Sequence, residues 1–292
     1  MKRWWALRAW ALRAWVGAPV GALLGATALT SGCVGATCPT LRITDPAAAL
    51  RAAKSASGAP IRSLRADAKI DQRSKQGRIK GRILMFVERP DRVRFDAVTQ
   101  FGPALILTSD GQQFALSDFK DNRYMTGPAC ANNLARVVGV ALSSAEVASV
   151  LLGDAPLIGA EKAGTQQGLT CSGEGQYVLT RKAADGAHEE LAFAVPAADV
   201  QKPPEAQRLY LAALTLWGPR GERLYRVRYE DYRKVGQTEL PHTVRIDDFV
   251  NDSDALLRLS DVAVDVKVPD GAFVQSPRAG LKVEEVACDQ VQ

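Results

Sequence analysis

The stretch "GRILMFVERPDRVRFDAV", residues Gly81–Val98, decides the fold because it contains two strands and the turn between them. Apolar residues occupy alternate positions in both halves: Ile83, Met85 and Val87 before the turn, and Val93, Phe95 and Ala97 after it. Side chains of a strand point alternately to its two faces, so each half has one apolar and one polar face. Pro90-Asp91 supplies the turn, and we expect an antiparallel hairpin with one buried face.

Similar hairpins are predicted along most of the chain. Asp110-Gly111 lies between two alternating runs, which is a strong short-range signal for a hairpin. Asp185-Gly186 and Pro219–Gly221 occupy equivalent places further on. Strands that are joined by tight turns are antiparallel, and we expect about ten or eleven of them.

Two segments have helical spacing instead. The first, Asp45–Ala56, has Thr44 or Asp45 as its cap and Pro46 at the first helical position. The second, Asn132–Gly153, is interpreted as two short helices inserted between strands. The predicted class is α+β: a strongly curved, incompletely closed antiparallel β-barrel with a helical lid.

The predicted lid is short compared with the sheet that it covers. We therefore expect a concave apolar surface that is left open for a lipid-like guest, and a filled core is the alternative. The residues expected to line this surface are Ile83, Met85, Val87, Val93, Phe95, Phe114, Leu116, Tyr225, Val227, Tyr229, Val262, Val264 and Val266.

The N-terminus has the features of a bacterial lipoprotein signal. A basic head is followed by the apolar run Trp15–Leu29 and by "ALTSGC", Ala28–Cys33. This last sequence resembles a lipobox, in which the cysteine is acylated, for example with palmitate, and becomes the first residue after cleavage. We expect a signal peptide at residues 1–32, lipid attachment at Cys33 and a tether at residues 33–45. Ordinary cleavage that leaves a plain thiol is the alternative.

Removal of the signal changes the charge balance. The chain has 37 basic and 32 acidic side chains, and four of the basic ones precede Cys33, which leaves 33 against 32. A nearly neutral protein lacks the basic surface of a nucleic-acid-binding protein. The segment Arg62–Arg94 is still basic, with eleven Lys or Arg against four Asp or Glu. We interpret it as a solvated strand edge, and a surface that contacts anionic lipid headgroups is the alternative.

Four cysteines remain once Cys33 is acylated, and an even number outside the cytoplasm indicates disulfides. Four cysteines allow three pairings, and the sequence does not select one. Because the ends of a domain are often close together, our preferred pairing joins Cys38 to Cys288 and Cys130 to Cys171. Four unpaired thiols are the alternative.

The sequence contains no motif that indicates catalysis, a metal site or a cofactor. His188 and His242 each lie beside a turn without a second ligand at metal-binding spacing, and we expect both on the surface. The acidic turn Asp247–Asp254 lacks the glycine of a calcium loop and is interpreted as solvated. No nucleophile and base occur in a recognised motif, so we expect a binding protein rather than an enzyme.

Three segments of the sequence contain, one each and in this order, an Arg-Pro turn, a Ser-Asp-Gly hairpin and a late Phe strand. They are "VERPDRVRFDAV" (Val87–Val98), "LILTSDGQQFALSD" (Leu105–Asp118) and "DGAFVQSP" (Asp270–Pro277). In this order they resemble the bacterial lipoprotein-carrier superfamily of the LolA/LolB type, over residues 46–278. The resemblance implies a helical lid over a cavity for acyl chains. It also implies that Arg89 holds the lid shut through hydrogen bonds to lid backbone, and a solvated turn residue is the alternative.

We expect a single domain at residues 46–286, with an insertion loop near residues 194–207 and a tail at residues 287–292. Val34 stands where an Asp would retain a lipoprotein in the inner membrane, so we expect the outer membrane, with the protein facing the periplasm. The expected function is to bind acyl chains of lipids or lipoproteins and to pass them on without catalysis. The alternative is a structural lipoprotein of an envelope complex, with a filled core and the basic segment as the interface with an envelope protein.

Overall fold

The described part of the chain begins just before Cys38. The computed structural model describes residues 37–57, 61–75, 77–138, 140–155 and 166–288. The predicted signal peptide at residues 1–32 and the predicted acylation site Cys33 lie outside these residues, as do the start of the tether and the end of the tail. No helix within the described ranges is long and apolar enough to span a bilayer.

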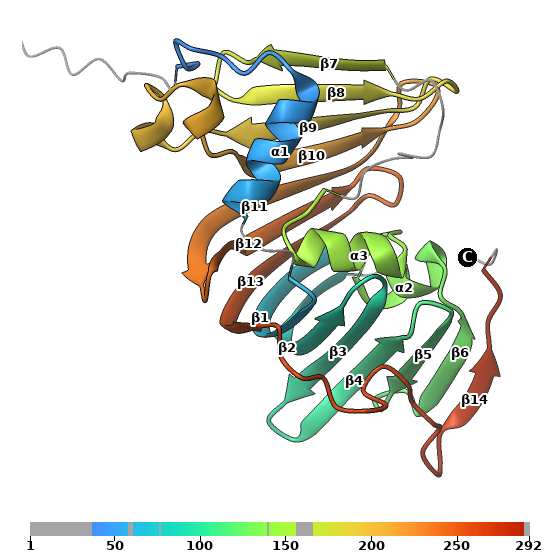
Figure 1. Ribbon diagram of the computed structural model, residues 1–292. Helices are drawn as coiled ribbons and strands as arrows, with labels where there is room; N and C mark the ends of the chain where they lie inside the picture. The colour runs from blue at the N-terminus through green and yellow to red at the C-terminus, as the bar shows by residue number, and fades with distance from the viewer. Residues whose placement is uncertain (1–36, 58–60, 76, 139, 156–165, 289–292) are drawn as a thin grey trace, which may run out of the picture. The chain divides into compact units, whose positions relative to one another are not determined.

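One sheet of fourteen strands makes up most of the described chain (Figure 1). The strands are β1 (Ser63–Ser74), β2 (Gly77–Glu88), β3 (Arg92–Thr99), β4 (Gly102–Ser109), β5 (Gln113–Asp118), β6 (Arg123–Pro128), β7 (Gln166–Cys171), β8 (Tyr177–Lys182), β9 (His188–Ala194), β10 (Tyr210–Trp217), β11 (Arg223–Val235), β12 (Thr238–Asp248), β13 (Ser253–Val264) and β14 (Lys282–Glu285). The sheet ends at β14 and β7, which are not paired with each other in the described residues. The incompletely closed antiparallel barrel that the sequence predicts is therefore confirmed.

The expected count of ten or eleven strands is too low by at least three, and two of the missed strands are the end strands, which lack an alternating pattern. The sequence of β7 is the largely polar "QQGLTC", and β14 is the four-residue "KVEE". A strand at the end of a sheet needs a partner on one side only, so short polar sequences suffice there.

The chain builds the sheet as two meanders that meet in the middle. Strands β1 to β6 form the first and β7 to β13 form the second, and β13 returns to pair with β1. The predicted hairpin of Gly81–Val98 is confirmed, with Met85 opposite Phe95. The predicted Asp110-Gly111 hairpin is also confirmed. Gly111 has a φ of 95°, in the left-handed region that glycine adopts without strain.

Three α-helices lie outside the sheet, and Figure 1 shows α1 and α3 on the same face of it. They are α1 (Pro46–Ala56), α2 (Ala131–Val138) and α3 (Ser144–Leu151). The carboxylate of Asp45 accepts hydrogen bonds from two backbone N–H groups in the first turn of α1. Ser143 and Glu146 form a capping box at the start of α3, in which each side chain accepts from the other's backbone. Both predicted helical segments are confirmed.

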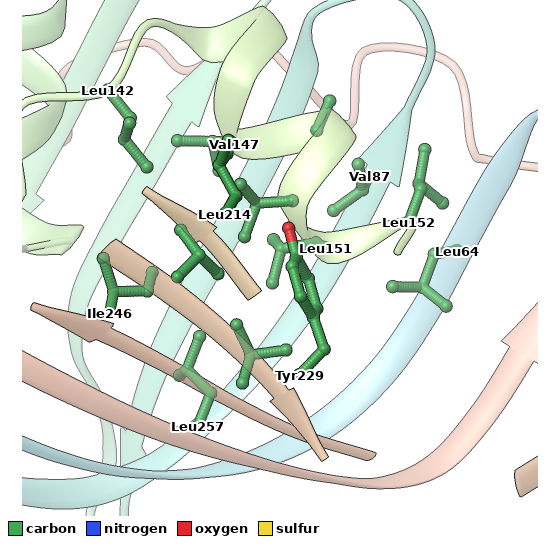
Figure 2. Packing of buried hydrophobic residues seen from close by; sticks show 14 of the residues in the cluster. Leu64, Val87, Leu142, Val147, Leu151, Leu152, Leu214, Tyr229, Ile246 and Leu257 are labelled. Carbon is green, nitrogen blue, oxygen red and sulfur yellow. The ribbon is translucent and has the colours of Figure 1, made fainter. Parts of the chain in front are cut away.

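Alternating strand residues form one hydrophobic core on the face that carries the helices. Figure 2 shows Val147 and Leu151 of α3 in the same cluster as Ile246 and Leu257 of the sheet. The core is therefore shared between the lid and strands from both meanders.

The basic segment Arg62–Arg94 does not lie at a strand edge, which corrects the expectation. It spans β1 and β2, which are central in the strand order. Three of its exposed side chains pair with nearby carboxylates: Arg78 with Asp71, Arg82 with Asp67, and Arg92 with Glu88. Local pairing neutralises part of the basic excess.

One disulfide joins Cys38 to Cys171 at the end of β7. The expected pairs Cys38–Cys288 and Cys130–Cys171 are therefore wrong. The expectation assumed that the two ends of the domain are adjacent. The N-terminal segment instead follows the second meander to β7, whereas the C-terminal β14 is at the opposite end of the strand order.

Tyr177 fixes this N-terminal segment and the predicted insertion loop at residues 194–207 to the sheet. The loop contains the 3₁₀ turns η1 (Ala197–Asp199) and η2 (Pro204–Ala206). The buried hydroxyl of Tyr177 accepts from the Ile43 N–H at 2.9 Å and donates to the Gln207 side-chain oxygen at 2.9 Å. The Gln207 amide nitrogen in turn donates to the carbonyl oxygens of Leu41 and Lys202.

We expect Tyr177→Phe to lower the free energy of unfolding by about 1–3 kcal/mol, because two buried polar groups lose their partner. Chemical denaturation followed by circular dichroism measures the change. Ser260→Ala is the matched control, because Ser260 is exposed and its hydrogen bond to the Asp67 carbonyl is 3.5 Å long. The control should change the same quantity by less than about 0.5 kcal/mol. Equal losses in the two variants would contradict the role given to Tyr177.

Candidate functional site

Helix α3 forms a lid over the apolar face of the sheet. Its sequence "SAEVASVL" places Val147, Val150 and Leu151 on one side, where they are buried. Ala145 and Ser149 lie on the opposite side and line a groove. The helix therefore separates two spaces, a cavity beneath it and a groove beside it.

The cavity beneath α3 is apolar and small. Its volume is about 30 Å³, several times smaller than the roughly 150 Å³ of a protein cavity that accepts benzene. A hydrocarbon tail does not fit in this space. The expectation of an open concave surface is therefore wrong beneath the lid, where side chains of the helix and the sheet fill the interior.

The predicted lining residues lie at three kinds of place. Ile83, Met85 and Phe95 line the small cavity. Seven others are buried in the surrounding core: Val87, Val93, Phe114, Leu116, Tyr225, Val227 and Tyr229. The last three, Val262, Val264 and Val266, are only half-buried. The alternating pattern identified the correct face of each strand in the first two groups.

The sequence reasoning missed the lid's own contribution to the cavity. Val147, Val150 and Leu151 line it from above, and Ile246 and Leu257 line it from the second meander. The helical spacing of the three lid residues was visible in the sequence. The contribution of β12 and β13 was not, because it depends on the pairing of β13 with β1.

The groove lies between α1 and α3, above β9 to β11. Its volume is about 550 Å³, within the range of roughly 300–1,000 Å³ that is usual for ligand pockets. Apolar side chains make up much of its lining, namely Leu50, Ala53, Phe193, Leu209, Leu211 and Tyr232. Lys54, Arg89 and Glu146 add charged groups at the same site. This combination suits an amphiphile with an apolar tail and a polar head.

Arg89 connects the hairpin of β2 and β3 to the end of the lid. Its guanidinium forms an ion pair with Asp154, three residues after α3, and its Nε donates to the Ile61 carbonyl at 2.7 Å. The Tyr229 hydroxyl donates to the Asp154 carbonyl at 3.2 Å. The resemblance implied contacts from Arg89 to lid backbone. The observed contact is with a side chain beyond the lid, and Tyr229 makes the contact with backbone.

Burial keeps the tyrosines of this region neutral. It raises the pKa of Tyr229 and of Tyr232 well above the ordinary value of a phenol. It also raises the pKa of Tyr210, which lines the groove, to about 12, with a further contribution from the nearby Glu239 carboxylate. Tyr229 therefore keeps its proton and remains a hydrogen-bond donor to Asp154 across the physiological pH range.

The described residues contain no cluster of His, Cys, Asp and Glu that could hold a metal ion. In the acidic turn, Asp248 accepts from the backbone N–H groups of Val250 and Asn251, which is a turn-stabilising role. His242 is buried, and its Nδ1 lies 3.1 Å from the Leu240 carbonyl oxygen. The expectation that His242 is a surface residue is wrong because β12 is covered on both faces at that position.

Comparisons with known proteins give one matching family model and several similar solved structures. Residues 49–148 match the model of a family described as "Predicted periplasmic protein (DUF2092)". No curated protein matches the chain. The fold is similar to that of the LolA superfamily protein NE2245 from Nitrosomonas europaea, with 12% identity, a TM-score of 0.49, and coverage of 80% of this chain and 99% of that chain.

A second similar structure is a putative outer membrane lipoprotein-sorting protein domain from Vibrio parahaemolyticus. It has 11% identity and a TM-score of 0.48, and the match covers 77% of this chain and 94% of that chain. A DUF1329 family protein from Desulfovibrio piger has 9% identity and a TM-score of 0.49, with 78% and 94% coverage.

We expect Arg89→Ala to accelerate hydrogen exchange of the α3 amides by roughly two- to five-fold, because a partly exposed ion pair contributes about 0–1 kcal/mol. Exchange followed by mass spectrometry measures the rate for residues 144–152. Arg92→Ala is the matched control, since Arg92 belongs to the same hairpin but pairs with Glu88. Unchanged exchange rates of the α3 amides in Arg89→Ala, or the same acceleration in the control, would show that the Arg89–Asp154 ion pair does not hold the end of α3 in place.

Proposed function

We propose that this chain is a periplasmic lipoprotein, anchored in the outer membrane through Cys33, that binds an acyl chain of a lipid or lipoprotein and passes it on without catalysis. The observation that carries the proposal is the arrangement of α3, a short helix that covers a wide apolar face beside an apolar groove of about 550 Å³. The description of the matching family as periplasmic supports the location.

The acyl chain enters through the groove between α1 and α3, and its tail takes the place of the lid's apolar side chains. The groove supplies apolar contacts from Leu209 and Leu211, and its cationic groups Lys54 and Arg89 lie where an anionic head would remain near water. The small cavity lies on the other side of α3. Displacement of the helix therefore joins the two spaces.

Apolar burial, rather than the Arg89–Asp154 ion pair, sets the free energy of lid displacement. The Arg89–Asp154 ion pair is partly exposed and contributes about 0–1 kcal/mol. Removing Val147, Val150 and Leu151 from the core costs about 1.5–3 kcal/mol for each side chain. Each buried CH₂ of a guest returns about 0.8 kcal/mol, so on the order of ten methylenes offset the displacement. Long acyl chains should therefore bind and short ones should not.

The second candidate function is that of a structural lipoprotein in an envelope complex. The observation that favours it is the filled interior beneath α3, where the cavity measures about 30 Å³. In that case α3 is a fixed part of the core, and the exposed outer face of the sheet contacts a protein partner. Acyl-chain titration distinguishes the two functions.

We expect the purified protein to bind palmitate but not octanoate, because only the longer chain supplies enough methylenes to displace the lid. Native mass spectrometry and isothermal titration calorimetry measure the stoichiometry and the affinity. Ala53→Trp should weaken palmitate binding at least tenfold, since Ala53 lines the groove on α1 and the indole would occupy it.

Ala47→Trp is the matched control, because Ala47 is exposed on the same helix and should leave binding unchanged. Failure of the unmodified protein to bind palmitate at millimolar concentration would refute acyl-chain binding and favour the structural role.

A further inference from the structure

The C-terminal segment forms a strap across the face of β4 to β6 that is opposite to the lid. The side-chain nitrogen of Gln275 donates to the carbonyl oxygens of Ile106 and Ala115 at 3.0 Å each, and its side-chain oxygen accepts from the Ser117 hydroxyl at 2.8 Å. The Tyr124 hydroxyl donates to the Gln275 carbonyl at 2.8 Å. Gln275 therefore fixes the strap to three neighbouring strands.

The strap continues into β14, which is the one parallel neighbour in the described sheet. Lys282 is opposite Arg123 and Glu285 is opposite Thr126 in the register of β14 and β6. The Val286 N–H donates to the Thr126 carbonyl at 2.9 Å, so the pairing extends past the last strand residue. The chain is then directed along β6 toward the start of α2.

The same register brings Cys288 to Cys130. Counting on from Glu285 and Thr126, Cys288 comes beside residue 129, next to Cys130. A separate contact supports this placement, because the Asn132 side-chain nitrogen donates to the Cys288 carbonyl at 3.0 Å. Cys130 is fixed in turn as the residue before α2, where its carbonyl accepts from the Asn133 and Leu134 N–H groups. Both cysteines are half-buried.

We propose that Cys130 and Cys288 form a second disulfide in the exported protein. If Cys33 is acylated, as the proposed function requires, Cys130 and Cys288 are the two cysteines that remain once Cys38 and Cys171 are joined. The two thiols lose two protons and two electrons as the S–S bond forms, and a disulfide-bearing thiol oxidase of the periplasm is reduced to its dithiol. Formation of Cys38–Cys171 requires an oxidant of the same class.

The bond fixes the end of the sheet that has no other covalent attachment. β14 has only four residues, and Val283 within it is exposed. A link from Cys288 to Cys130 closes a covalent loop that contains β7 to β14 and the strap. The strap and β14 then stay in place at the end of the first meander while the lid moves.

Peptide mapping tests the proposal. The full-length chain is expressed for export to the periplasm, purified, and alkylated before it is unfolded. After trypsin without reduction, the peptide of residues 124–136, which contains Cys130, should be linked to the peptide of residues 283–292, which contains Cys288. Recovery of both peptides as alkylated thiols, in a sample where Cys38 is linked to Cys171, would overturn the proposal. Linkage of either cysteine to Cys38 or Cys171 would also overturn it.

Hydrogen exchange of the Val283–Val286 amides provides a second readout. Cys130→Ser, Cys288→Ser and the double variant should each accelerate this exchange by the same factor, at least about tenfold, because all three remove one bond. Ala129→Ser is the matched control and should leave the exchange unchanged. A larger acceleration in the double variant than in either single variant, or no acceleration in any of the three, would contradict a bond between these two residues.

Discussion

The structure depends on one constraint: a sheet of fourteen strands has a single apolar face, and short helices must cover it. Among the described helices, α3 has eight residues, and three of them, Val147, Val150 and Leu151, reach into the core. The strong curvature of the sheet makes this small cover sufficient, because Ile83 of the first meander and Ile246 of the second line the same small space. The interior is closed only while α3 stays in place.

This dependence explains why one small helix is the element through which a guest would act. The polar contacts at its end, from Arg89 and Tyr229 to Asp154, position the segment after the helix but hold it weakly. Apolar burial holds it more strongly, and a hydrocarbon chain supplies the same kind of burial. Under the proposed function, an acyl chain and the lid compete for the same surface, and the length of the acyl chain decides the outcome.

Alternation and turn residues predicted much of this fold. The pattern around Arg89 gave β2 and β3 with the correct buried faces, because side-chain direction in a strand follows from its period of two. The pattern did not reveal how far Leu142 and Leu151 fill the interior, since filling depends on the distance between lid and sheet. The wrong disulfides came from the assumption that the two ends of the domain are adjacent, whereas the place of Cys38 beside β7 follows from the strand order and the Tyr177 hydrogen bonds.

The distance between α3 and the sheet during palmitate binding tests the central claim most directly. Spin labels on non-canonical amino acids at Ala141, two residues before the Ser143 cap of α3, and at Lys69 on β1 leave the cysteines intact, and neither position lines the groove. Pulsed electron spin resonance should show one distance in the free protein and a second, longer distance whose population grows with bound palmitate. An unchanged distance at full palmitate occupancy would contradict the account, because the acyl chain would then bind without displacement of the lid.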